Sequence, residues 1–73
     1  MSEHEFRNDN GYMVRVFDLG GGITRVNEHR SVTDTRTFYV IDGEVWTVRD
    51  ELVHKRADIG TSATVKGWVN QAS

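Results

Sequence analysis

An Asp-Gly pair at positions 42 and 43 separates two runs of β-branched and aromatic residues, and this segment most constrains the fold. Residues 35–41 and 44–48 are rich in Val, Ile, Thr, Phe, Tyr and Trp. An Asp-Gly pair between such runs is typical of a two-residue hairpin turn in which both turn residues have positive φ. The segment therefore predicts a β-hairpin, with Tyr39 and Trp46 as cross-strand neighbours.

Both faces of this hairpin carry apolar side chains. Strand alternation places Phe38, Val40 and Val45 on one face, and Tyr39, Ile41, Trp46 and Val48 on the other. A domain of two layers covers only one face of a sheet with helices. We therefore expect one face to form the core, while the second is covered by the N-terminal tail, by a second copy of the chain or by a partner.

A second hairpin precedes the first one. Residues 12–19 and 23–28 read as strands that a glycine-rich loop, residues 20–22, connects. A loop of three residues sets Val16 opposite Val26 and Phe17 opposite Arg25. These two hairpins predict a meander of three or four strands.

The last third of the chain has a different period. Asp50 is positioned to cap a short helix over residues 51–59, which Gly60 ends. Thr61 or Ser62 then caps a second helix, on which four apolar residues recur at helical spacing. These are Val65, Trp68, Val69 and Ala72. A fifth strand over residues 61–72 is the alternative.

These elements predict an α+β fold: a small antiparallel meander sheet of three or four strands with one or two short C-terminal helices on one face. A five-stranded SH3-like barrel is the alternative. We expect residues 1–10 to be a flexible N-terminal tail and residues 11–73 to form a single small α+β domain, because 73 residues suffice for one modest core.

The charge and composition favour a soluble interaction protein. The net charge is −2, and the surplus of acids lies within residues 1–10, so the body is nearly neutral. A neutral body argues against a binder that holds nucleic acid by counterion release. No apolar run approaches the roughly 20 residues that span a membrane, and the first residues lack the apolar segment of a signal peptide. We expect a cytoplasmic protein with no membrane partner.

Groups for catalysis are few. The chain has no cysteine, and its three histidines are widely separated. Asp42 and Asp50 already have turn and cap roles. We therefore expect no enzymatic activity, no catalytic residue, no metal site and no cofactor.

These features predict a small non-enzymatic protein that binds and modulates a macromolecular partner, of the kind that phages and mobile elements direct at a host protein. A protein is the expected partner. We expect Tyr39 and Trp46 to anchor the contact, because aromatic and Arg side chains dominate such interfaces. The expected surrounding cations are Arg25, Arg30, Arg36 and Arg49.

The segment 61–69, TSATVKGWV, resembles the DNA-reading helix of phage excisionases and related winged-helix regulators. The resemblance implies a DNA-binding transcription regulator in which this helix enters a groove. Its contacts would come from Lys55, Arg56, Thr64 and Lys66. Gly67 departs from the family pattern, which has a base there. Nucleic acid is therefore the alternative partner, and a self-associating structural protein such as a homodimer is the third hypothesis.

Overall fold

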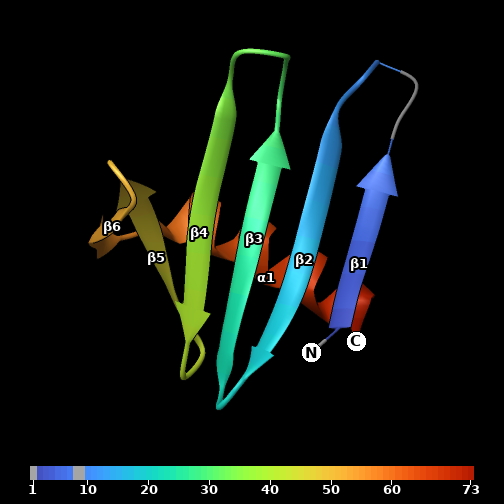
Figure 1. Ribbon diagram of the computed structural model, residues 1–73. Coiled ribbons are helices and arrows are strands. Elements are labelled where there is room, and N and C mark those ends of the chain that lie inside the picture. Colours follow the sequence, from blue (N-terminus) through green and yellow to red (C-terminus); the bar gives the residue numbers. More distant parts are fainter. Residues whose placement is uncertain (1, 8–9) are drawn as a thin grey trace.

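The computed structural model describes residues 2–7 and 10–73. In this part of the chain, six strands form one antiparallel sheet and a single helix packs across it (Figure 1). The elements in chain order are β1 (Ser2–Arg7), β2 (Met13–Gly20), β3 (Ile23–His29), β4 (Thr35–Ile41), β5 (Glu44–Arg49), β6 (Leu52–Arg56) and α1 (Ile59–Ala72).

Each strand pairs with its neighbours in the chain, so the order in the sheet is β1-β2-β3-β4-β5-β6. This confirms the α+β class, the antiparallel meander and the C-terminal position of the helix. The sheet has six strands rather than three or four. The alternative of an SH3-like barrel is wrong, because the sheet is open and β1 and β6 form its two edges.

The two predicted hairpins are present with the predicted registers. In the β4–β5 turn, Asp42 has a φ of 51° and Gly43 a φ of 80°, and Tyr39 pairs with Trp46. Between β2 and β3, Phe17 pairs with Arg25. The second turn has two residues instead of three, because Gly20 pairs with Ile23 and the strand bulges at Leu19.

The N-terminal segment differs from the expected tail. Residues Ser2–Arg7 form β1, which pairs with β2 along its whole length. Phe6 lies opposite Val14 and packs against the core, while charged residues alternate with it on the other face. Residues 1, 8 and 9 of the expected tail lie outside the described residues.

The predicted helix over residues 51–59 is wrong. Leu52–Arg56 form strand β6, which pairs with β5. Asp50 does not cap a helix; with Glu51 it forms the β5–β6 turn, where their φ values are 53° and 67°. The open hydrogen-bonding edge of β5 is thereby paired, which a helix at this place would not achieve.

Residues 61–72 are helical, as expected, and the alternative of a strand there is wrong. The helix begins earlier than predicted, because Asp58 rather than Thr61 or Ser62 is its N-cap. The Asp58 carboxylate accepts a hydrogen bond of 2.7 Å from the Thr61 backbone N–H. In the described part of the chain, no helix is long and apolar enough to span a membrane.

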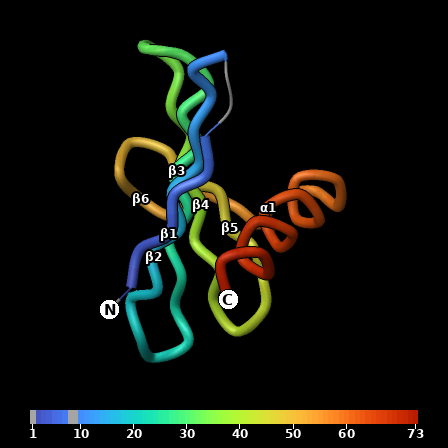
Figure 2. The backbone as a smooth tube through the Cα atoms, turned by 90° about the vertical axis from the view of Figure 1, so that its right-hand side faces the viewer, coloured from blue at the N-terminus to red at the C-terminus, as the bar shows by residue number. Residues whose placement is uncertain are grey.

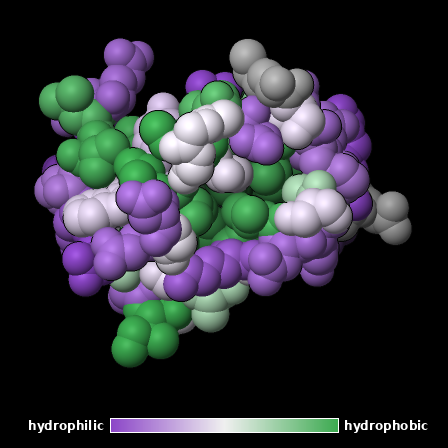
Figure 3. Space-filling model, turned by 90° about the horizontal axis from the view of Figure 1, so that it is seen from below, coloured by the Kyte–Doolittle hydropathy of each residue, from purple (hydrophilic) through white to green (hydrophobic). Residues whose placement is uncertain are grey.

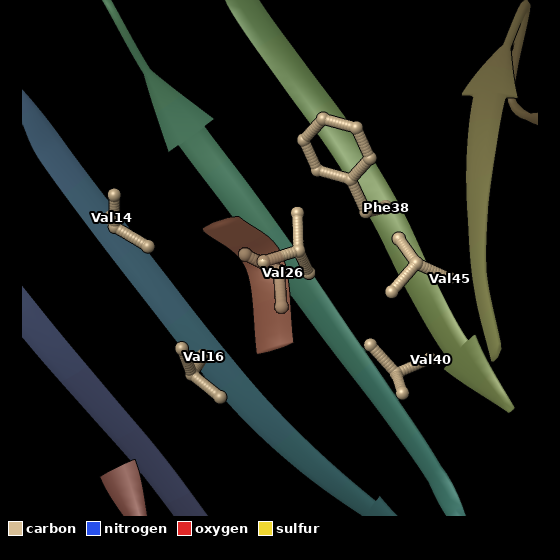
Figure 4. Close-up of a cluster of buried hydrophobic side chains, with 7 residues drawn as sticks. Val14, Val16, Val26, Phe38, Val40 and Val45 are labelled. Atoms are coloured by element: carbon tan, nitrogen blue, oxygen red, sulfur yellow. The ribbon is translucent and has the colours of Figure 1, made fainter. Parts of the chain in front are cut away.

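The core lies between α1 and one face of the sheet (Figure 4). Figures 1 and 2 show α1 crossing the strands on this side only. Val65 is 1% exposed and inserts from the helix, and Trp68 and Val69 pack beside it while partly exposed. The buried side chains from the sheet are Val14, Val16, Val26, Phe38, Val40 and Val45. The prediction that Phe38, Val40 and Val45 share the core face is confirmed.

We expect Gly67→Ala to stabilise the protein. Gly67 lies inside α1, and a Cβ at this position meets no atom within 4 Å. Ala in a helix interior is more favourable than Gly by about 1 kcal/mol, so the urea midpoint should rise accordingly. Gly43→Ala is the matched control: its Cβ also has space, but its φ of 80° makes Ala unfavourable. A lower midpoint for Gly67→Ala would contradict the packing of α1.

We expect Glu51→Gly to stabilise the protein as well. A left-handed conformation costs a residue with a Cβ roughly 1–2 kcal/mol, and Glu51 has a φ of 67°. Glycine removes this cost, whereas Glu51→Ala shortens the side chain and keeps it. Thermal unfolding should therefore show a higher midpoint for Glu51→Gly than for Glu51→Ala. Equal midpoints would contradict the β5–β6 turn.

Candidate functional site

The face of the sheet opposite α1 is the candidate site, and we call it the open face. Figure 2 shows the helix on one side of the sheet, while the β5–β6 turn leans toward the other side. Because side chains alternate along a strand, the residues between the core positions point to the open face. Its principal residues are Glu3, Glu5, Arg7, Arg15, Phe17, Ile23, Arg25, Asn27, Thr37, Tyr39, Ile41, Trp46 and Arg56.

One residue from each strand lies at the same level on the open face. Every neighbouring pair in this line is a register pair of the sheet, so the line crosses all six strands. We call it the central row. From β1 to β6 it consists of Glu3, Phe17, Arg25, Tyr39, Trp46 and Arg56.

Two arginines of the central row lie over aromatic rings. The Arg25 Cζ atom is 4.4 Å from the ring centroid of Phe17, and the Arg56 Cζ atom is 5.5 Å from that of Trp46. Both distances fall within the roughly 6 Å range of cation–π attraction. The Arg25 Nε atom is buried in this contact and has no hydrogen-bond partner among the described residues. Two of the three rings in the row, those of Phe17 and Trp46, are thus shielded from water by an arginine.

Most charges of the open face neutralise one another. The Arg15 Nε atom is 3.1 Å from a Glu5 carboxylate oxygen, and Arg56 is 3.3 Å from Glu44. The hydrogen bond from Arg7, and to a lesser extent that from Arg15, holds the pKa of Glu5 below its usual value despite some desolvation. Among the described residues of the face, Arg25 is the cation without an ion pair.

The predicted protein-binding residues divide between two faces. Tyr39, Trp46 and Arg25 meet on the open face, as neighbours in the central row. Arg36 pairs with Glu28 and shares the helix-covered face with Phe38. The structure therefore does not join the six residues into one surface, and Arg30 and Arg49 are not part of the open face either.

Arg30 and Arg36 line a groove of about 370 Å³ between the sheet and the first turns of α1. Glu28 and Asp58 line it as well, so its charges are balanced, and the Arg30 Nε atom is 4.0 Å from Glu28. Beside the groove, the Tyr12 hydroxyl donates to Glu28 over 2.5 Å. Burial, and then this hydrogen bond to a carboxylate, raise the pKa of Tyr12 to about 12.

Arg49, the last residue of β5, pairs with Leu52 beside the exposed β5–β6 turn. It lies two residues beyond Thr47, which is on the helix-covered face of the strand. Because side chains alternate along β5, the Arg49 side chain points to the face of the sheet opposite that of Trp46.

The residues of the DNA-binding alternative are also dispersed. Arg56 lies over Trp46 on the open face, and Thr64 lines the groove and donates to the Gly60 carbonyl oxygen at 3.1 Å. Lys66 lines a different opening together with Val40 and Val69. Figure 3, which views the molecule from below, shows apolar side chains within a polar surround at this end.

Lys55 is opposite Thr47 in the β5–β6 pair, whereas Arg56 is opposite Trp46. These two cations therefore point to opposite sides of the sheet. Together with the separation of Thr64 from Lys66, this leaves the described chain without a single positive surface formed by all four residues.

Three open-face residues were missed by sequence reasoning as parts of a binding surface: Glu3, Phe17 and Arg56 in its role beside Trp46. The predicted pairing of Phe17 with Arg25 was a signal for one of them. The other two depend on β1 and β6, which the sequence did not reveal. Among the described residues, no group of three or more His, Cys, Asp or Glu is placed to hold a metal ion.

No protein-family model, curated protein or solved structure matches this chain.

We expect the Tyr12 phenol to titrate near pH 12. A pKa raised above the unfolded value of about 10 stabilises the folded state fully below pH 10, and this contribution is lost as the pH rises toward about 12. Tyr12→Phe should weaken the alkaline loss of stability, measured by urea unfolding at several pH values. Glu28→Gln should lower the pKa of Tyr12 without restoring 10, since burial is the larger cause. An ordinary pKa for Tyr12 in an absorbance titration would contradict this contact.

Proposed function

We propose that this protein is a small non-enzymatic interaction protein that binds and modulates a protein partner through the open face. The observation that supports this proposal is the central row, in which Phe17, Tyr39 and Trp46 lie on a sheet face that α1 does not cover. Tyr, Trp and Arg are the side chains that most often carry binding energy between proteins. Here they are cross-strand neighbours on one face of the sheet.

The charges of the open face favour a protein over a nucleic acid as the partner. A surface that binds single strands combines aromatic rings with a positive path for the phosphates. On the open face, Arg15 and Arg56 are each paired with a carboxylate, which leaves little positive charge for phosphates. Apolar rings with a balanced charged surround suit the hydrophobic centre and polar rim of a protein interface.

The rings are also held in place before a partner binds. Tyr39 and Trp46 are cross-strand neighbours, and Arg25 and Arg56 pack on the adjacent rings. Side chains that are already ordered lose less conformational entropy on association. This pre-organisation supports a binding role for the row.

We expect Trp46→Ser to weaken partner binding at least about tenfold, since removal of a central aromatic side chain commonly has this effect or a larger one. The partner is first captured from lysate with the tagged wild-type protein and identified by mass spectrometry. Its dissociation constant is then measured by calorimetry for the wild type, Trp46→Ser and Arg25→Gln.

Val32→Ser is the matched control, because Val32 is an apolar residue that is 101% exposed and lies outside the open face. It should bind as the wild type does. A cooperative thermal transition of each variant shows that the fold is intact, and Arg25→Gln serves where Trp46→Ser unfolds. Unchanged binding by folded open-face variants would refute the proposal.

A further inference from the structure

We infer that the protein which fits the open face is a second copy of this chain, packed face to face about a two-fold axis parallel to the strands. This inference rests on the proposed function, since it names the protein that the face binds. The axis lies between the two sheets and passes between β3 and β4, at the middle of the six strands. Aligned packing of two sheets is a common arrangement in β-sandwiches.

The central row is complementary to its own reverse. A two-fold axis along the strands keeps the level of each residue and reverses the order of the strands, so β1 faces β6 of the second copy. Glu3 then faces Arg56, Phe17 faces Trp46 and Arg25 faces Tyr39. Each contact occurs twice, as in every isologous interface.

All three facing pairs are chemically favourable. Glu3 and Arg56 have opposite charges, and Phe17 with Trp46 is an aromatic pair. Arg25 meets the ring and hydroxyl of a tyrosine, which supply a cation–π surface and a hydrogen-bond acceptor. Arg25 is the open-face arginine that lacks an ion pair in the described chain, and its Nε atom lacks a hydrogen-bond partner.

The neighbouring level on β3 and β4 follows the same symmetry. Ile23 pairs with Ile41 within the sheet, so the axis sets Ile23 of one copy against Ile41 of the other. On the other side of the row, Asn27 pairs with Thr37, and a polar residue again faces a polar one. On these two central strands, apolar and polar levels therefore coincide across the interface.

Two different two-fold axes would pack the open faces of two copies together, one parallel to the strands and one along the central row. The charges of the row favour the axis parallel to the strands. A two-fold axis along the central row keeps the order of the strands. Each residue of the row then faces the same residue of the second copy. Arg25 would then face Arg25, and Glu3 would face Glu3. Like charges that face each other in an interface are strongly unfavourable.

The size of the face suits a weak dimer. Six strands about 4.8 Å apart and about 20 Å long give a footprint of about 500 Å² on each copy. The total of about 1,000 Å² is at the lower limit of specific interfaces, so we expect a reversible dimer that forms at high protein concentration. Val53 of β6, which is 50% exposed and pairs with Val48 on the open face, lies beside the β5–β6 turn, and this turn leans toward the same side. It adds contact at the edge of the second copy.

A charge exchange tests the inference. The wild type, Glu3→Arg, Arg56→Glu and the double variant are compared by sedimentation equilibrium from about 1 μM to 1 mM. We expect each single variant to raise the dimer dissociation constant at least about tenfold, and the double variant to return it to within about threefold of the wild type. Glu3 and Arg56 lie on opposite edges of the sheet, so a rescue cannot arise within one copy.

The controls separate this inference from the proposed function. Glu3 is 3.8 Å from Arg15 and Arg56 is 3.3 Å from Glu44, and the exchange restores neither contact, so lost intramolecular pairs predict no rescue. A wild type that stays monomeric, or a double variant no better than the single ones, overturns the second copy as the occupant. If the monomeric wild type binds a different protein and Trp46→Ser weakens that binding, the proposed function stands. If Trp46→Ser changes neither association nor capture, both proposals fail.

Discussion

The rest of the structure depends on one constraint: a single helix seals a sheet of six strands, so only one face can become the core. Val65 is the fully buried residue of α1, and all the other buried side chains come from the sheet face below it. The apolar residues that alternate with them have no layer of their own. Cross-strand contacts and the arginines over Phe17 and Trp46 limit the exposure of these rings to water.

Local signals were sufficient for the elements that local chemistry determines. The Asp-Gly turn requires two positive φ values, and this requirement, together with alternation, predicts the pairing of Tyr39 with Trp46. The glycines before Ile23 act in the same way for β2 and β3, although the bulge at Leu19 was not foreseen. The helical spacing of Val65, Trp68 and Val69 predicts α1.

The two edge strands were missed because their neighbours, rather than their sequences, stabilise them. β1 has one strongly apolar residue, Phe6, among charges, and it is a strand because β2 offers a paired edge and a core contact. At β6, Asp50 has the chemistry of an N-cap as well as of a left-handed turn residue. Glu51 in the same turn is an unfavourable residue, so tertiary pairing overrides local preference.

The same reason explains which part of the candidate site was predictable. Tyr39, Trp46 and Arg25 lie within the two recognised hairpins, whereas Glu3 and Arg56 join the central row only through the register of β1 and β6. The edge strands also decide the symmetry of the row. The four central strands alone present aromatic residues at both ends, and a face of that kind accepts many apolar partners. With β1 and β6 added, the row ends in an acid on one side and a base on the other, and this polarity makes its reverse the complementary surface.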